Sequence, residues 1–129
     1  MMGWMTEPTI QPRHAGQVPT ERYGEAHIQW LASAAASGAR ELMFGLTTID
    51  VGGGSPMHRH PNCEEVLHML DGEIDQLVEG GRAFRMGAGD TITIPRNLRH
   101  RAINVGHTPA VMIVAFSSPC RETIVEETP

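Results

Sequence analysis

Residues 52–72 read GGGSPMHRHPNCEEVLHMLDG, and this stretch decides how the chain is organised. It places His58 and His60 two positions apart, and carboxylates follow at Glu64 and Glu65. Because alternate side chains of an extended strand point to the same face, both imidazoles share one face. Imidazole and carboxylate together suit a first-row divalent metal ion. Taken alone, the stretch predicts either a metal site or a solvated, histidine-rich loop.

A second stretch, GAGDTITIPRNLRHRAIN at residues 87–104, favours the metal site. Its DTITIP segment alternates polar and apolar residues, as a half-buried strand does, and Pro95 ends it. Asn97 then stands where a turn needs a residue that tolerates unusual backbone dihedrals. His100 opens a further strand and supplies another imidazole.

Together the two stretches resemble the paired signature of the cupin superfamily. The first half of that signature is Gly, five residues, His-x-His, three or four residues, Glu, six residues and Gly, which falls here on Gly52, His58, His60, Glu65 and Gly72. The second half is Gly, five residues, Pro-x-Gly, two residues, His, three residues and Asn, which falls on Gly89, Pro95, Asn97, His100 and Asn104. Only Asn97 departs, standing where the family usually has Gly. Asn is the commonest other residue in the left-handed region, so we expect the turn to be kept.

The resemblance implies an all-β fold, a double-stranded β-helix (jelly-roll) cupin barrel with one divalent metal ion in its mouth. The ligands it implies are His58, His60, Glu65 and His100. Four ligands leave one or two positions open for water or substrate on an ion that accepts five or six. Iron, manganese, nickel, copper and zinc all accept nitrogen and oxygen donors, so the identity of the metal stays open.

Glu64 and Glu65 compete for the carboxylate position, because neighbours on a regular strand point to opposite faces. Alternation alone does not choose between them, since both faces of the strand carry polar as well as apolar residues. The spacing to Gly72 favours Glu65, with the six intervening residues of the cupin pattern. We expect a hairpin at Asp71-Gly72 to hold this register and to keep His68 out of the site.

Length and composition indicate one domain with its own core, since the chain has 129 residues and 40% of them are hydrophobic. The net charge of −5 and the lack of a basic cluster argue against a nucleic-acid partner. Two cysteines, Cys63 and Cys120, do not make a disulfide framework. The sequence shows no export signal and no apolar run of membrane-spanning length. We therefore expect a cytoplasmic protein without a membrane partner.

We divide the chain into an N-terminal arm (1–22), a cupin barrel (23–118) and a C-terminal tail (119–129). Alternating or apolar runs predict about nine strands; the principal ones lie at 26–31, 40–51, 65–70, 73–79, 82–86, 90–94, 98–105 and 110–117, and an edge strand is expected in the ETIVE segment of the tail. The run at 32–38 is a linker or a single helical turn, and Gly80-Gly81 predicts a hairpin. The strand at 40–51 is apolar on both faces, which predicts a homodimer.

The function implied by the resemblance is that of a metal-dependent enzyme acting on a small organic molecule. One carboxylate leaves residual positive charge on the ion, which favours an anionic chelating substrate such as an enolate or a keto acid. Among such enzymes we expect a dioxygenase, which is a kind of oxidoreductase. Isomerase, lyase or decarboxylase chemistry stays open, as does a non-catalytic cupin that binds a small ligand. The sequence identifies no general acid or base beyond the ligands, and Cys63 is interpreted as a bystander.

Overall fold

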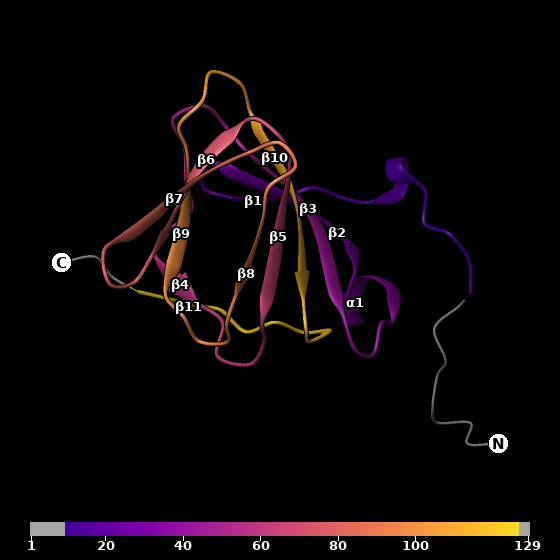
Figure 1. Cartoon of the computed structure of the whole chain (residues 1–129). Helices are drawn as coiled ribbons and strands as arrows, with labels where there is room; N and C mark the ends of the chain where they lie inside the picture. The colour runs from indigo at the N-terminus through magenta and orange to yellow at the C-terminus, as the bar shows by residue number, and fades with distance from the viewer. Residues whose placement is uncertain (1–9, 127–129) are drawn as a thin grey trace.

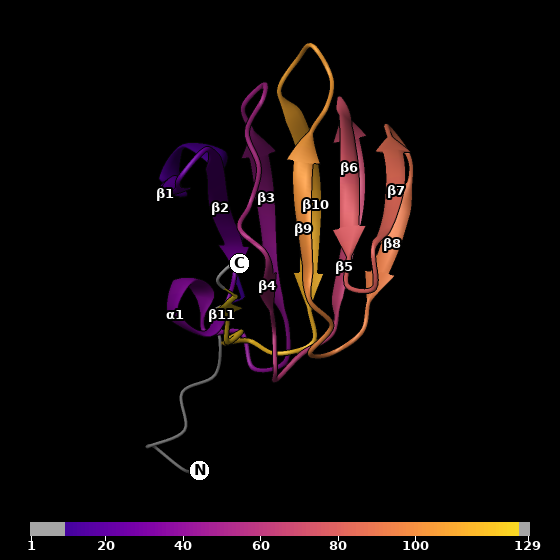
Figure 2. The same ribbon diagram turned by 90° about the vertical axis from the view of Figure 1, so that its left-hand side faces the viewer.

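The computed structural model describes residues 10–126, in which two antiparallel β-sheets face each other (Figure 1). The six-stranded sheet has the order β1 (Glu21–Tyr23), β2 (Ala26–Ala32), β3 (Met43–Ile49), β10 (Ala110–Phe116), β5 (Glu65–Asp71) and β8 (Thr91–Ile94). The five-stranded sheet has the order β11 (Ile124–Val125), β4 (His58–Arg59), β9 (His100–Asn104), β6 (Glu73–Val78) and β7 (Arg82–Gly87). Figure 2 shows the second sheet in front of the first. This arrangement confirms the predicted all-β jelly roll.

Side chains that alternate along the strands fill the space between the sheets. In β10 and in the first five residues of β5, every second residue is buried, as the two-residue period of a strand requires. Both sheets contribute to one core, whose most enclosed members include Ile49, Met69, Ile74, Met112 and Phe116. The methionines of the strands therefore serve largely as core residues.

The hairpin predicted at Asp71-Gly72 is wrong, because the chain crosses there from one sheet to the other. β5 pairs with β10 and β8, whereas β6 pairs with β7 and β9. Gly72 has a φ of 80°, and a Cβ atom on it would lie 2.8 Å from the carbonyl oxygen of Pro109. The glycine thus lets the crossover pass close to another backbone segment. The hairpin predicted at Gly80-Gly81 is confirmed, since it joins the paired strands β6 and β7.

The strand expected at 40–51 is shorter in the structure and lies inside the first sheet. β3 pairs with β2 on one side and with β10 on the other. Thr47 and Ile49 point into the barrel, while Phe44 and Leu46 lie half-buried on the outer face. A Cβ atom on Gly45 would lie 2.9 Å from the indole ring of Trp30, so this glycine makes room for the tryptophan.

Residues near both ends of the described chain contact the barrel. Val18 is buried, and Arg13 donates to the carbonyl oxygens of Trp30 (2.8 Å) and Leu31 (2.9 Å), which holds the described part of the arm along β2. At the other end, β11 pairs with β4, as the predicted edge strand requires. Residues 1–9 of the predicted arm and 127–129 of the tail lie outside the described residues, and the division into arm, barrel and tail stays a prediction.

The helical segments are short. They are a 3-10 turn at Ala15–Gln17 (η1) and a single α-helical turn at Ala34–Ser37 (α1). The hydroxyl of Ser33 accepts from the backbone N–H of Ala36, which caps α1 and confirms the expected helical turn. Within residues 10–126, no helix has the length and apolar character that crossing a bilayer needs.

Candidate metal centre

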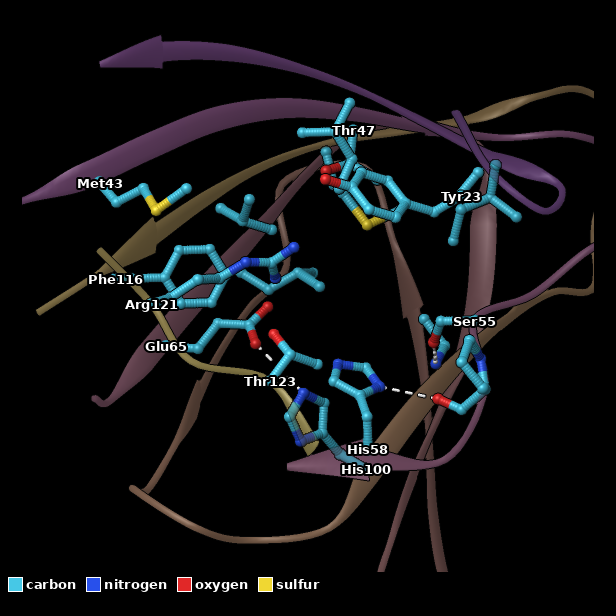
Figure 3. Close-up of a pocket in the computed structure, with 18 of the residues that line it drawn as sticks. Tyr23, Met43, Thr47, Ser55, His58, Glu65, His100, Phe116, Arg121 and Thr123 are labelled. Atoms are coloured by element: carbon cyan, nitrogen blue, oxygen red, sulfur yellow. Dashed lines mark hydrogen bonds and ion pairs between the residues drawn. The ribbon is translucent and has the colours of Figure 1, made fainter. Parts of the chain in front are cut away.

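Three imidazoles and one carboxylate meet at one end of the barrel. Figure 3 shows two of the imidazoles, His58 and His100, together with the carboxylate of Glu65. His58 lies on β4 and His60 directly follows it, Glu65 begins β5, and His100 begins β9. His58 and His100 are partners across the pairing of β4 with β9. The four potential ligand atoms lie within 4.8 Å of one another. The structure therefore brings together all four residues that the sequence predicts as ligands.

Backbone carbonyls orient the three imidazole rings. Each ring places its Nδ1 atom within hydrogen-bonding distance of a carbonyl oxygen, namely Pro56 for His58 (2.7 Å), Glu122 for His60 (3.0 Å) and Leu98 for His100 (2.8 Å). Because a carbonyl oxygen can only accept, each Nδ1 carries a proton and donates it. The Nε2 atoms are left to bind a metal ion, and such outer hydrogen bonds are what commonly fix metal-binding histidines.

The Nε2 atoms of His60 and His100 converge on the Glu65 carboxylate. His60 Nε2 lies 3.3 Å and His100 Nε2 3.1 Å from Glu65 Oε1. His60 Nε2 is buried and has no hydrogen-bond donor among the described residues. An imidazole lone pair that faces a carboxylate oxygen away from water needs a cation between them. A proton on His100 Nε2 satisfies one of these contacts, whereas a divalent ion satisfies all of them, so the donor set fits a metal.

The electrostatics of the cluster also suit a metal ion. Burial raises the pKa of Glu65, but the neighbouring His100 and His60 outweigh it and hold this pKa well below its usual range. Burial, together with the charge of His100, lowers the pKa of His58 to about 4. Burial also lowers the pKa of His100, but Glu65 raises it more, so the net shift is upward. At neutral pH, Glu65 is an anion and His58 is neutral, which are the protonation states that metal ligands need.

The strand register places Glu65 inside the barrel and Glu64 outside. Glu65 is 5% exposed and pairs with Ile94 of β8 and Phe116 of β10. Glu64 is exposed. His68 lies half-buried away from the cluster, with its Nδ1 atom 2.6 Å from the Thr91 hydroxyl, as expected. This register is held by the partner strands β8 and β10. The hairpin predicted from the sequence at Asp71-Gly72 plays no part in it.

The residues that flank the ligands have structural partners. Asn97 has a φ of 71°, which confirms the left-handed turn expected in place of glycine. Arg59 donates to Asn97 Oδ1 (2.6 Å) and to Glu126 Oε1 (2.7 Å), and Arg99 lies 3.8 Å from Glu79. Cys63 is buried in the core with a free thiol, and burial raises its pKa, so it is not an activated nucleophile.

A cavity of about 490 Å³ opens beside the cluster, and His58, Glu65 and His100 form part of its wall. This volume lies within the usual range for small-molecule sites. Most of the wall is apolar, with contributions from Ile28, Trp30, Met43, Leu67, Met112 and Phe116. The polar groups on it include Tyr23, Thr47, Gln76, Arg121 and Thr123. A ligand in this cavity reaches the open side of the four-residue cluster.

None of these five polar residues is predicted as part of the site from the sequence, and Arg121 and Gln76 show why. Arg121 lies in the segment predicted as tail, where no periodic pattern indicates which way a side chain points. Gln76 is completely buried on β6 and donates to the carbonyl oxygen of Arg101 (3.1 Å). The alternation of β6 does place Gln76 on the inner face with Ile74 and Val78. That pattern is the one signal that could have identified it.

Removal of the metal should lower the melting temperature and leave a folded protein. The core between the sheets is extensive without any ion, whereas an ion that binds only the native ligand geometry adds stability by mass action. The measurement is thermal unfolding followed by circular dichroism, with and without a chelator. Loss of the cooperative transition on chelation would show that the fold depends on the metal.

The fold and the cluster together define a small β-barrel with a candidate metal site at its mouth. The sequence profile of the cupin domain family matches residues 45–116, which is more than half of the chain and includes all four candidate ligands. The chain belongs to the cupin superfamily.

Curated relatives include plant proteins of two descriptions. The chain is 36% identical over 102 residues to germin-like protein 3-3 of Oryza sativa subsp. japonica, covering 72% of this chain and 45% of that protein. It is 34% identical over 90 residues to oxalate oxidase 1 of Hordeum vulgare, covering 63% of this chain and 45% of that protein. This chain thus spans less than half the length of these relatives.

Solved structures are similar in fold. The oxalate decarboxylase of Lactobacillus farciminis, in its formate complex, superposes with a TM-score of 0.80 and 23% identity, covering 87% of this chain and 34% of that one. At this identity, the likeness concerns the jelly-roll fold alone.

Proposed function

We propose that the protein is a metal-dependent oxidoreductase that consumes dioxygen and acts on a small, anionic, metal-chelating carboxylate. The observation that carries this proposal is that the cluster is buried in the protein but borders a cavity on one side. Three of its four members form part of the cavity wall, so an ion held by them would have its open coordination positions toward the cavity. An open position beside a substrate-sized space is typical of catalytic metal sites and not of structural ones.

Charge supports the choice of substrate. The donor set has one anion, Glu65, so a divalent ion keeps net positive charge when the three imidazoles are neutral. A carboxylate or enolate neutralises that charge and supplies oxygen donors. The oxalate oxidase of barley, a relative at 34% identity, has a name that refers to a substrate of this chemistry.

The proposed reaction restricts the metal. Zinc has no redox chemistry, which leaves iron, manganese, nickel and copper among the ions that this donor set accepts, and iron and manganese are our first choices. Such an ion, when bound, polarises a coordinated carboxylate and supplies the redox capacity for reaction with dioxygen. The chain itself holds the imidazoles in one tautomer through Pro56, Leu98 and Glu122, and its largely apolar cavity wall surrounds the substrate.

The experiment is to reconstitute the metal-free protein separately with Fe²⁺, Mn²⁺ and Zn²⁺ and to measure oxygen uptake and carbon dioxide release. Oxalate, 2-oxo acids and 1,3-diketones serve as substrates. We expect oxygen uptake with iron or manganese, for at least one carboxylate, and none with zinc. Release of carbon dioxide without oxygen uptake would show that the protein is a decarboxylase and would contradict the proposed oxidation. Saturable binding without any product would indicate a ligand-binding protein.

We also propose that the protein is a homodimer, and expect a dimer mass in solution. Leu42 is 59% exposed at the start of the segment that leads into β3, and Phe44, Leu46, Val111 and Ile113 lie only half-buried on the outer face of the six-stranded sheet. A symmetric partner would cover these apolar residues. Multi-angle light scattering measures the mass. A monomer at micromolar concentration would contradict this proposal.

A further inference from the structure

We infer that Arg121 binds a carboxylate of the substrate, and that the cavity therefore takes a dianion with one group on the metal and the other on Arg121. This inference rests on the proposed function and deepens it. It concerns a residue from the segment after the last barrel strand, which lies outside both motifs that supply the metal ligands.

The backbone around Arg121 is held in place on both sides. Asn62 donates to the carbonyl oxygen of Cys120 (3.0 Å) and accepts from the backbone N–H of Glu122 (2.8 Å). The carbonyl oxygen of Glu122 accepts from His60 Nδ1. Farther along, β11 pairs with β4, the strand that carries His58. The segment that carries Arg121 is therefore tied to the same residues that build the metal site.

The side chain of Arg121 lies against two aromatic rings on the cavity wall, and Figure 3 shows it beside one of them, Phe116. Its guanidinium carbon is 4.7 Å from the centroid of the Trp30 ring and 4.8 Å from that of Phe116. Trp30 occupies the space that Gly45 leaves. Ring faces attract the cation but offer no acceptor in the plane of its N–H groups. The two rings thus position the guanidinium and offer its N–H groups no oxygen acceptor.

Several other arginines donate hydrogen bonds within the protein. Arg59 and Arg85 donate to carboxylates, and Arg13 donates to carbonyl oxygens. Across residues 10–126, the guanidinium of Arg121 makes no hydrogen bond and no ion pair. Burial lowers its pKa and nearby Glu65 opposes that shift, yet an arginine stays protonated in proteins. A half-buried cation on the cavity wall with free, planar donors fits a carboxylate, which accepts two parallel hydrogen bonds.

The charge of the loaded site favours a dianion. A divalent ion with Glu65 keeps one positive charge, and Arg121 adds a second one on the same cavity wall. A ligand with two anionic groups neutralises both charges, and a monoanion leaves one unpaired in a largely apolar space. Arg121 would then distinguish dianions from monoanions of equal size.

A purely structural role for Arg121 makes a different prediction. If the stacking on Trp30 and Phe116 only fastens the segment to the barrel, its loss lowers the melting temperature and affects all ligands alike. If Arg121 instead recognises a carboxylate, its loss changes the ratio of the affinity for a dianion to the affinity for a monoanion of similar size. The test therefore compares oxalate, a dianion, with oxamate, in which an amide replaces one carboxylate at nearly the same size.

The experiment measures dissociation constants of both compounds by calorimetry on the Mn²⁺-loaded protein without dioxygen. The variants are Arg121→Gln and Arg121→Met, the second of which keeps the apolar stem over the rings if the first does not fold. Arg85→Gln is the control, because Arg85 pairs with Asp75 on the outside of the barrel. We expect Arg121→Gln to weaken oxalate binding by about 10- to 100-fold, as loss of hydrogen bonds to a charged group does, and to reduce the preference over oxamate accordingly.

Metal content should be the same in all four proteins, and Arg85→Gln should keep the wild-type preference. An unchanged ratio of oxalate to oxamate affinity in both Arg121 variants would overturn the inference, even if the wild-type protein consumes oxygen. Absence of oxalate binding to the wild type would overturn it as well. Arg121-dependent binding without turnover by any metal form would leave the inference standing and contradict the proposed function.

Discussion

Glu65→Ala should lose nearly all bound metal, with any activity abolished, whereas Glu64→Ala should keep its full metal content. Glu65 is the one anionic donor of the cluster, and its removal leaves three neutral imidazoles around a divalent ion. Loss of an outer partner of a metal ligand already costs roughly 10- to 100-fold in affinity, so loss of a direct ligand should cost more. Elemental analysis after reconstitution and dialysis provides the measurement.

The Glu64→Ala variant is a matched control because it removes the same side chain from the adjacent position. Glu64 is exposed and Glu65 is buried, and the pairing of β5 with β8 and β10 fixes which of them points inward. A one-residue slip would exchange their faces and turn His68 inward. Loss of the metal in Glu64→Ala with retention in Glu65→Ala would show that the register is wrong.

Phe116→Ala should lower the free energy of unfolding by about 3–5 kcal/mol, the usual cost of truncating a buried phenylalanine. Phe116 is 1% exposed, and its ring centroid lies 6.0 Å from that of Trp30 and 5.1 Å from that of His60. Its ring also lies beneath the guanidinium of Arg121. The substitution therefore opens a void where core and metal cluster meet. Urea unfolding of the metal-free protein measures the effect without the contribution of metal binding.

Phe84→Ala is the control for this prediction, since Phe84 on β7 is 44% exposed. Its truncation should cost less than about 1 kcal/mol, as for most surface substitutions. Equal destabilisation by the two substitutions would contradict the assignment of Phe116 to the core beside the site.

The cupin resemblance indicates the four side chains that the structure brings together, and short-range regularities predict most strands. The spacing of His58, His60 and Glu65 reflects side-chain alternation on and around β4 and β5, and the alternation in DTITIP reflects one buried face of β8. Gly80-Gly81 and Asp71-Gly72 carry equally strong local turn signals, yet only the first is a hairpin. Whether two consecutive strands pair or enter different sheets depends on long-range pairing, such as β5 with β10, which no dipeptide encodes.

The role of the segment after β10 could not be predicted for the same reason. Its contacts with Asn62 and His60 join residues about sixty positions apart, and its composition resembles that of a loose, acidic end. A short irregular segment has no period from which the direction of Arg121 could be inferred. The stacking on Trp30 and Phe116 becomes visible only when three distant segments are folded together.

The central claim is that His58, His60, Glu65 and His100 bind one metal ion on the wall of the cavity. Anomalous diffraction from crystals of the Mn²⁺-reconstituted protein tests it most directly, because it locates the ion without reference to activity. We expect a single strong peak at about 2.0–2.3 Å from the Nε2 atoms of the three histidines and from an oxygen of Glu65, with the remaining positions open to the cavity. A peak bound through Nδ1 atoms, or one at other residues with none between these four side chains, would contradict it.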